Sequence, residues 1–158
     1  MHMSDALISP AVAGVMATAS TGLIAYSVYK TKDELEEKKI PLMGVMGAFV
    51  FAAQMINFTI PGTGSSGHIG GGLLLASILG PAPAFLVMST VLIIQALFFA
   101  DGGVLALGCN IFNMGFYGCM IAYPLIFKPI MKKGFSKGRI VLASILASVI
   151  GLQLGAFS

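Results

Sequence analysis

Long uncharged runs alternate with short polar segments along this chain. Apolar runs of about 18 residues or more are typical of helices that cross a membrane. The pattern therefore predicts an all-α integral membrane protein, a single polytopic domain over residues 1–158 with a bundle of about six transmembrane helices, one of them short. The expected spans are residues 6–29, 40–60, 69–80, 84–100, 104–127 and 140–158, of which 69–80 is the short one.

The positive charges set the expected orientation of these spans. All nine Lys and Arg residues fall in two segments, 30–39 and 128–139. Cytoplasmic loops carry an excess of Lys and Arg, so both segments are expected inside the cell. That requires an even number of crossings between them, which favours residues 69–80 as a crossing segment. The amino terminus, the segment 61–68 and Asp101 are then expected outside, in a multi-pass protein of the cell membrane.

Composition excludes several classes of protein. Charged residues make up 9% of the chain, hydrophobic residues 57%, and the mean hydropathy is +0.94. So little charge cannot cover a water-facing surface, since soluble domains carry about 25% charged residues. The sequence has no paired carboxylates or Ser-His-Asp set that can be placed together, so we do not expect an enzyme. No nucleic-acid partner is expected, and the lipid bilayer is the predicted surrounding.

The two histidines, His2 and His68, are expected on the same side of the membrane. Because His2 is not a small residue, Met1 is expected to be retained. The Met1 amine, the His2 backbone nitrogen and the His2 Nδ1 can close two chelate rings around one ion, with a metal-driven loss of the amide proton. His68 can supply a fourth nitrogen. Four nitrogens in a plane suit Ni(II), Cu(II) or low-spin Co(II), whereas Zn(II) prefers a tetrahedron.

The glycine-rich segment 62–67 precedes His68 and is expected to be a loop. Its two glycines have the spacing of a phosphate-binding loop, but His68 and Ile69 replace the required Lys and Ser/Thr, so nucleotide binding is rejected. A flexible loop that approaches a ligand closely is the better interpretation. Thr63, Ser65 and Ser66 are expected to form hydrogen bonds around His68, and Asn57, near the outer end of its span, is expected to reach the site.

Other polar and small residues within the spans are expected to serve packing. The amides are predicted to form hydrogen bonds between helices; they are Gln54, Asn57, Gln95, Asn110 and Asn113. Asp5 and Asp101 are expected at helix caps and turns. Cys109 and Cys119 are expected to be small core residues. A stripe of small residues with four-residue spacing favours internal packing, with docking to a partner as the alternative; it contains Ala143, Ala147, Gly151 and Gly155.

Three segments of the chain resemble the CbiM/NikM family, the substrate-binding membrane subunits of energy-coupling-factor cobalt and nickel importers. The first is the opening Met1-His2. The other two are 47–58 with 64–68, and 95–103 with 106–110 and 112–115, so that the three together extend over roughly residues 1–115.

The resemblance implies a metal-capturing subunit of an ATP-driven transporter rather than an enzyme. It implies ligation by the Met1 amine, the His2 backbone nitrogen and imidazole, and His68. No prosthetic group is implied, and Co(II) or Ni(II) is the transported ligand. The implied partners are a transmembrane coupling subunit, a pair of ATPase subunits that hydrolyse ATP, and a small membrane accessory subunit.

The chain departs from the family at three places. Residues 3–6 differ from the opening that family members often have, and Thr59 stands where proline is expected. Family members usually continue for at least one more helix, so we expect the chain to be truncated at its carboxyl end or to be one part of a split subunit.

Two alternatives remain open at this point. One is a membrane redox or haem protein with His2 and His68 as axial ligands. The other is a structural assembly subunit that binds no metal. The sequence does not choose between cobalt and nickel.

Overall fold

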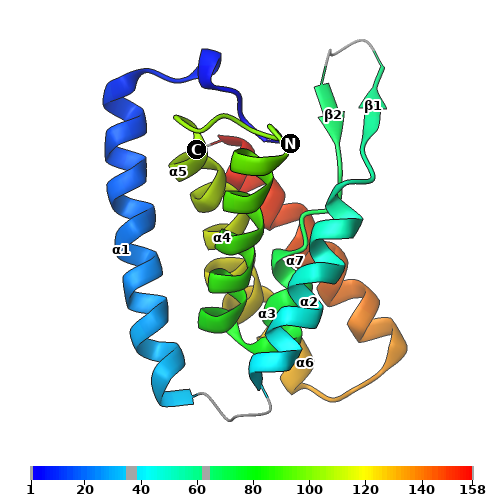
Figure 1. Cartoon of the computed structure of the whole chain (residues 1–158). Coiled ribbons are helices and arrows are strands. Elements are labelled where there is room, and N and C mark those ends of the chain that lie inside the picture. Colours follow the sequence, from blue (N-terminus) through cyan, green and yellow to red (C-terminus); the bar gives the residue numbers. More distant parts are fainter. Residues whose placement is uncertain (1, 35–38, 62–64, 158) are drawn as a thin grey trace.

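The computed structural model describes residues 2–34, 39–61 and 65–157, and in these residues the chain is almost entirely helical (Figure 1). The helices are η1 (Asp5–Leu7), α1 (Pro10–Glu34), α2 (Lys39–Gln54), α3 (Gly72–Leu79), α4 (Pro81–Phe98), α5 (Leu107–Asn110), η2 (Ile111–Phe127), α6 (Lys128–Lys132) and α7 (Lys137–Phe157). A short hairpin, β1 (Phe58–Ile60) and β2 (Ser65–Gly67), joins α2 to α3.

Within the described residues, four helices are long and apolar enough to cross a membrane; they are Pro10–Lys32, Pro81–Phe98, Leu107–Lys132 and Lys137–Phe157. The third is continuous through α5, η2 and α6, and η2 is wound with the wider i→i+5 hydrogen bonds of a π-helix. A shorter apolar helix, Lys39–Gln54, accompanies them. The prediction of an all-α membrane protein is confirmed.

The second predicted span ends earlier than expected. Helix α2 stops at Gln54, and residues 58–60 form β1 instead of a last helical turn. β1 pairs antiparallel with β2, with Phe58 opposite Gly67. Pro61 disfavours helical geometry at the residue before it, and Thr59 and Ile60 are β-branched, so the chain is extended here. The predicted helix to residue 60, and the predicted loop over residues 65–67, were therefore wrong.

The short segment after the hairpin is an extended stretch followed by a short helix. Helix α3 has eight residues, which is only about 12 Å of helix. Gly71 at its start has φ +79°, and a Cβ there would lie 2.6 Å from Val50 Cγ1. Gly80 at its end has φ +91° and turns the chain directly into α4. Non-helical backbone at membrane depth is tolerated where protein surrounds it, and here α2, α4 and η2 surround it.

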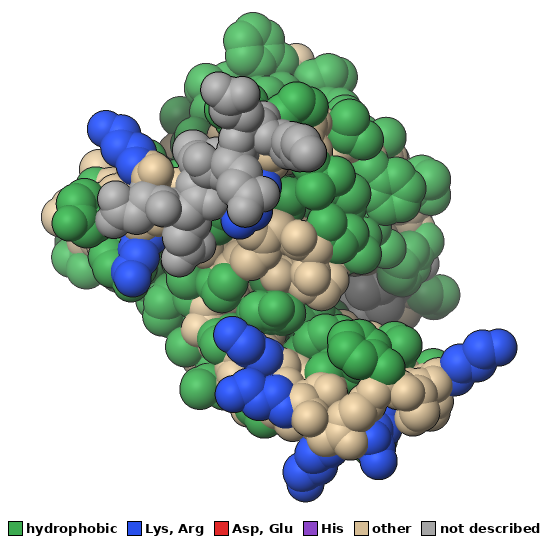
Figure 2. All heavy atoms as spheres, turned by 90° about the horizontal axis from the view of Figure 1, so that it is seen from below, with side chains coloured by type: hydrophobic (Ala, Val, Ile, Leu, Met, Phe, Trp, Pro, Cys, Tyr) green, Lys and Arg blue, Asp and Glu red, His purple; other side chains and the backbone are tan. Residues whose placement is uncertain are grey.

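Both basic segments lie at the same end of the bundle. In Figure 1 the hairpin and the two ends of the chain are at the top, whereas the end of α1, the start of α2 and α6 are at the bottom. Figure 2 shows this bottom face, where Lys and Arg side chains gather on both segments. The described basic residues of both segments thus lie at one end of the bundle, as an even number of crossings between the segments requires. Lys38 lies outside the described residues.

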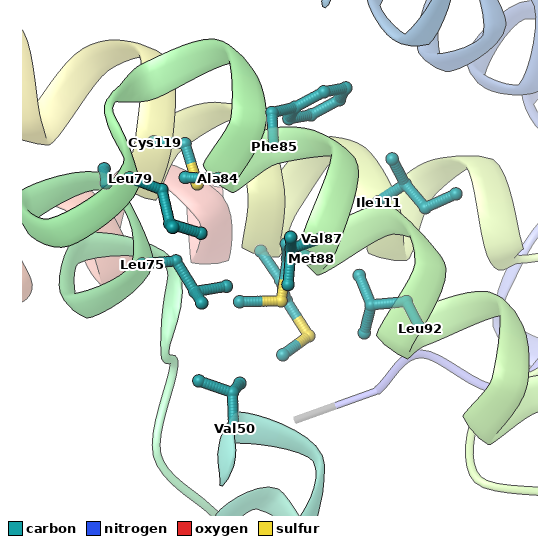
Figure 3. Close-up of a cluster of buried hydrophobic side chains, with 12 residues drawn as sticks. Val50, Leu75, Leu79, Ala84, Phe85, Val87, Met88, Leu92, Ile111 and Cys119 are labelled. Carbon is teal, nitrogen blue, oxygen red and sulfur yellow. The ribbon is translucent and has the colours of Figure 1, made fainter. Parts of the chain in front are cut away.

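The apolar core lies where α3, α4 and η2 meet (Figure 3). Leu75, Phe85, Met88 and Leu92 are almost fully buried in it, and the Phe85 ring lies close against Gly115. Many large apolar side chains on the outside of the helices are exposed, as a lipid-facing surface requires.

The stripe of small residues on α7 packs inside the bundle. Ala143 and Ala147 are fully buried, and a Cβ at Gly151 would lie 3.1 Å from Ala122 Cβ on η2. A Cβ at Gly155 would lie 2.9 Å from the Asn113 carbonyl oxygen. Internal packing against η2, the favoured interpretation of this stripe, is confirmed.

Candidate metal site

The two histidines meet at the hairpin end of the bundle, although they are far apart in the sequence. The imidazole of His2 stacks on that of His68, with ring centroids 4.8 Å apart and ring planes inclined by 26°. His2 lies in the extended arm before η1, and His68 follows β2 directly. The His2 side chain is 4% exposed and His68 is 6% exposed. The structure therefore brings together the two imidazoles that the sequence singled out.

The arm that carries His2 is held through the backbone of Met3. The Met3 N–H donates to Asn110 Oδ1 at 2.8 Å, and Asn110 Nδ2 donates to the Met3 carbonyl at 3.2 Å. The Gly103 N–H donates to the same carbonyl at 3.0 Å. Asn110 was predicted to join helices, but its described hydrogen bonds hold the arm instead.

Two glycines let the arm lie directly on the segment after α4. A Cβ at Gly103 would lie 1.8 Å from Asp5 Oδ1, and a Cβ at Gly102 would lie 3.0 Å from His2 Cβ. Asp5 accepts a hydrogen bond from the Ala106 N–H at 2.9 Å. Asp5 therefore ties the arm to this segment, and its predicted role as a cap of the first long helix was wrong.

Each imidazole uses one ring nitrogen in a hydrogen bond and leaves the other without a protein partner. His2 Nδ1 lies 2.9 Å from Asp101 Oδ1, and His68 Nδ1 lies 2.8 Å from the Ile69 carbonyl. Both Nε2 atoms are buried, and neither has a partner at hydrogen-bonding geometry among the described residues, although the Gln95 side chain lies close enough to His2 to oppose the lowering of its pKa by burial. Metal-ligating histidines commonly bond one ring nitrogen to a carboxylate or carbonyl in this way.

Burial also keeps both imidazoles in the form that binds metal. Removal from water lowers the pKa of His2, against the opposing effect of Asp101. Removal from water likewise lowers the pKa of His68, against its bond to the Ile69 carbonyl. A neutral imidazole is the ligand form, so at neutral pH no proton has to be displaced from either ring before it can bind.

The chelate expected at His2 uses the nitrogen that here faces Asp101. Coordination through Nδ1 therefore requires this atom to exchange Asp101 for the ion. Alternatively, Nε2 coordinates while Asp101 keeps Nδ1, and the His2 backbone nitrogen then cannot reach the same ion. The donor atom of the His2 ring stays a prediction, and Asp101 is the residue that bears on it.

A pair of buried glutamines lies beneath the histidines. Gln95 Nε2 on α4 donates to Gln54 Oε1 on α2 at 3.0 Å, which confirms the predicted bond between helices. Gln54 Nε2 donates to the Gly70 carbonyl at 3.0 Å, two residues after His68. Gln95 Oε1 is buried without a partner among the described residues. The pair fixes the extended segment that carries His68.

The remaining predicted site residues are placed less directly. Met1 and Thr63 lie outside the described residues, as do the side chains of Ser65 and Ser66. Asn57 is exposed between α2 and β1. These assignments stay predictions.

Side chains alone do not make a full ligand set in the part of the chain that the structure describes. No group of three or more His, Cys, Asp and Glu residues occurs there in an arrangement that could hold a metal. Cys109 and Cys119 are free and buried, as expected of core residues, and the Cys119 thiol donates to the Gly72 carbonyl at 3.4 Å. A complete site therefore needs donors beyond these side chains, such as backbone or terminal nitrogens.

A cleft of about 720 Å³ opens beside His2 and runs between η2 and α7. Its polar lining includes Asn110, Asn113 and Gln153, and glycines 70–72 contribute backbone. His2 is thus next to a space that can admit a hydrated ion.

Sequence reasoning missed the roles of Asp101 and Asn110. Asp101 was interpreted as a turn residue, yet it bonds His2, and Asn110 holds Met3. The available signal was the Asp101-Gly102-Gly103 tripeptide, because two adjacent glycines beside an acid indicate close approach of another backbone.

The sequence profile of the family described as cobalt uptake substrate-specific transmembrane region matches residues 2–158. The cobalt transport protein CbiM of Acetoanaerobium sticklandii is 36% identical, over 95% of this chain and 62% of that protein. The fused nickel transport protein NikMN of Rhodobacter capsulatus is 35% identical, over 99% of this chain and 45% of that protein. The chain thus spans about half to two thirds of the length of these relatives.

A solved structure with the same fold supports the match. The crystal structure of a transition metal transporter superposes with a TM-score of 0.86 at 35% identity, covering 99% of this chain and 66% of that one.

Proposed function

The chain belongs to the family of cobalt uptake substrate-specific transmembrane regions, and from this premise we propose that it captures Co(II) or Ni(II) at the outer face of the cell membrane for uptake. It acts as a substrate-selecting subunit of a transporter and not as an enzyme.

One observation carries this proposal: two buried imidazoles, stacked 4.8 Å apart, each with a buried Nε2 that has no described protein partner. An unpaired polar atom inside a protein is costly unless a ligand completes it. The low pKa of both rings favours neutral nitrogen donors, which suit Co(II) and Ni(II).

The complete donor set that we propose is the Met1 amine, the His2 backbone nitrogen and imidazole, and one nitrogen of His68. The absence of a three-residue side-chain cluster in the described residues agrees with such a set, because two of its donors are main-chain nitrogens. Four nitrogens close to one plane favour Ni(II), Cu(II) or low-spin Co(II) and disfavour tetrahedral Zn(II).

The direction of transport follows from the charges. The basic segments lie at the end opposite the histidines, and the positive-inside rule places that end in the cytoplasm. The ion is therefore captured from outside. Its release inside is driven by ATP hydrolysis on partner chains, namely a coupling transmembrane subunit, ATPase subunits and a small accessory subunit, as in energy-coupling-factor importers.

Haem ligation by the two histidines is disfavoured by their geometry. Axial ligands point their ring edges at an iron from opposite sides of a flat macrocycle. His2 and His68 instead face each other with their ring planes at a centroid separation of 4.8 Å, which leaves no room for a macrocycle between them.

Metal binding by the purified protein tests the proposal. We expect one Ni(II) or Co(II) per chain with micromolar or tighter affinity, and much weaker Zn(II) binding. The variants His2→Ala and His68→Ala should each lose tight binding while unfolding at nearly the same temperature as the unsubstituted protein. Tight binding by either variant would exclude its imidazole from the site.

A further inference from the structure

Asn110 holds the peptide next to the proposed ligand by both of its hydrogen-bonding groups. It ends α5, is 3% exposed, and bonds the Met3 N–H through Oδ1 and the Met3 carbonyl through Nδ2. A primary amide offers a donor and an acceptor at nearly the spacing of a peptide group. Its side chain therefore binds the arm as a neighbouring strand would.

The bond to the Met3 N–H bears directly on His2. That N–H belongs to the peptide that joins His2 to Met3, so fixing it fixes the plane on the carbonyl side of His2 Cα. In this structure the ring is also held by its 2.9 Å contact with Asp101, which Nδ1 gives up if it binds the ion. Asn110 thus limits the directions that the His2 backbone nitrogen and imidazole can take.

The residues around Asn110 leave space for its amide and hold the same arm. A Cβ at Gly102 would lie 3.1 Å from Asn110 Nδ2, so a larger residue there would disturb the amide. The Gly103 N–H donates to the same Met3 carbonyl, and Asp5 bonds the Ala106 N–H one turn before Asn110. The arm is thus held at two consecutive points, with Asn110 the nearer to His2.

We infer that Asn110 is a positioning residue of the metal site: without touching the ion, it orients the His2 backbone nitrogen and ring so that they converge with His68. This inference rests on the proposed function. It predicts that Asn110 determines the geometry of the bound metal as well as the affinity.

Asn110→Ala and Asn110→Asp separate the two bonds. Alanine removes both, whereas aspartate keeps an acceptor for the Met3 N–H and places a second oxygen against the Met3 carbonyl. A matched control is Ser20→Ala, which removes a buried 2.6 Å hydrogen bond from α1 to the Gly108 carbonyl without a described bond to the arm. Ser20→Ala therefore removes a buried hydrogen bond at Gly108, two residues before Asn110.

The experiment titrates Ni(II) into the full detergent-purified chain and records affinity, visible absorption spectrum and unfolding temperature for each protein. We expect Asn110→Ala to weaken binding about 10- to 100-fold and to shift the nickel spectrum away from that of a planar nitrogen set. Asn110→Asp should fall between Ala and the unsubstituted chain. Ser20→Ala should change affinity less than about twofold and leave the spectrum unchanged, whatever its unfolding temperature.

Unchanged affinity and spectrum in Asn110→Ala would overturn the positioning role while leaving the proposed function standing. So would equal losses in Asn110→Ala and Ser20→Ala, because the effect would then be one of stability alone. If Asn110→Ala does not fold, Asn110→Asp decides, and an unchanged spectrum in it overturns the role. Absence of nickel and cobalt binding by the unsubstituted chain would overturn the proposed function and this inference together.

Discussion

The histidine end of the bundle and its apolar core are held together by opposite means. In the core, Leu75, Phe85 and Leu92 fill the space between α3, α4 and η2 and have no polar side-chain group to satisfy. At the histidine end, the arm is fixed by directional hydrogen bonds, and two imidazole nitrogens are left without described partners. The core is complete as it stands, whereas in the proposed function the site is completed by a metal ion.

This difference separates stability from metal selection. Apolar packing resists a change of volume but has little chemical selectivity, because nearby apolar residues can take each other's place. Hydrogen bonds to the backbone are directional, so they can fix the place of a metal-binding atom to within a few tenths of an ångström. Each of them contributes little net stability. Substitutions in the core should therefore change mainly the free energy of unfolding, and substitutions at the histidine end should change mainly the metal affinity.

The largest effect is expected from one extra residue placed before Met1. The addition turns the Met1 α-amine into an amide nitrogen and so removes the amine donor of the proposed five-membered chelate ring. We expect Ni(II) affinity to fall at least about 1,000-fold, or about 4 kcal/mol. Titration of the two proteins side by side measures this, with the unfolding temperature as control. Equal affinity in both would remove the Met1 amine from the site.

Phe85→Ala should affect the apolar core and not the histidine end of the bundle. The ring is fully buried against Gly115, so its removal leaves a cavity. We expect a loss of about 3 kcal/mol in the free energy of unfolding, with Ni(II) affinity unchanged below the unfolding temperature. Phe135→Ala is the matched control, since that ring is 87% exposed. A changed nickel spectrum in Phe85→Ala would show that core and site are coupled.

Gly103→Ala should disturb the site more than the core. The added Cβ would overlap Asp5 Oδ1, so the arm must move away from the segment after α4. We expect Ni(II) affinity to fall about 10- to 100-fold, or about 1.4–2.8 kcal/mol. Gly14→Ala serves as control, because a Cβ at that lipid-facing helical position meets nothing within 4 Å. Similar affinity in both variants would argue against a docked arm during binding.

Cys119→Ser is expected to have the smallest effect. The thiol is fully buried and donates to the Gly72 carbonyl, and a hydroxyl can keep that bond. We expect a change below about 1 kcal/mol in the free energy of unfolding and none in nickel binding. A loss of binding in this variant would make the cysteine part of the site, which thermal unfolding and titration together would reveal.

Most of the fold could be predicted from the sequence because lipid imposes simple rules. Uncharged runs predicted most of the helices, and the positions of the basic residues predicted that both basic segments lie at one end of the bundle. The errors came where short-range geometry overrides hydropathy. Residues 58–60 are apolar enough to continue α2, yet Pro61 and β-branched neighbours make them a strand.

The site was only partly predictable, for a different reason. The nitrogen chemistry of His2 and His68 follows from residue type, and the structure brings the two rings together. The contacts of Asp101 and Asn110 join residues about 100 positions apart, and no local pattern encodes such a contact. Only the adjacent Gly102 and Gly103 hinted that another chain segment lies there.

X-ray absorption at the nickel edge of the loaded protein tests the central claim most directly, because it counts and identifies the atoms bound to the ion. The account predicts four nitrogen neighbours near one plane, two of them imidazoles, with no sulfur. Replacing His68 by alanine should remove one imidazole from the spectrum. A shell of six oxygen or nitrogen atoms containing no imidazole would contradict the account, because the ion would then be bound without His2 and His68.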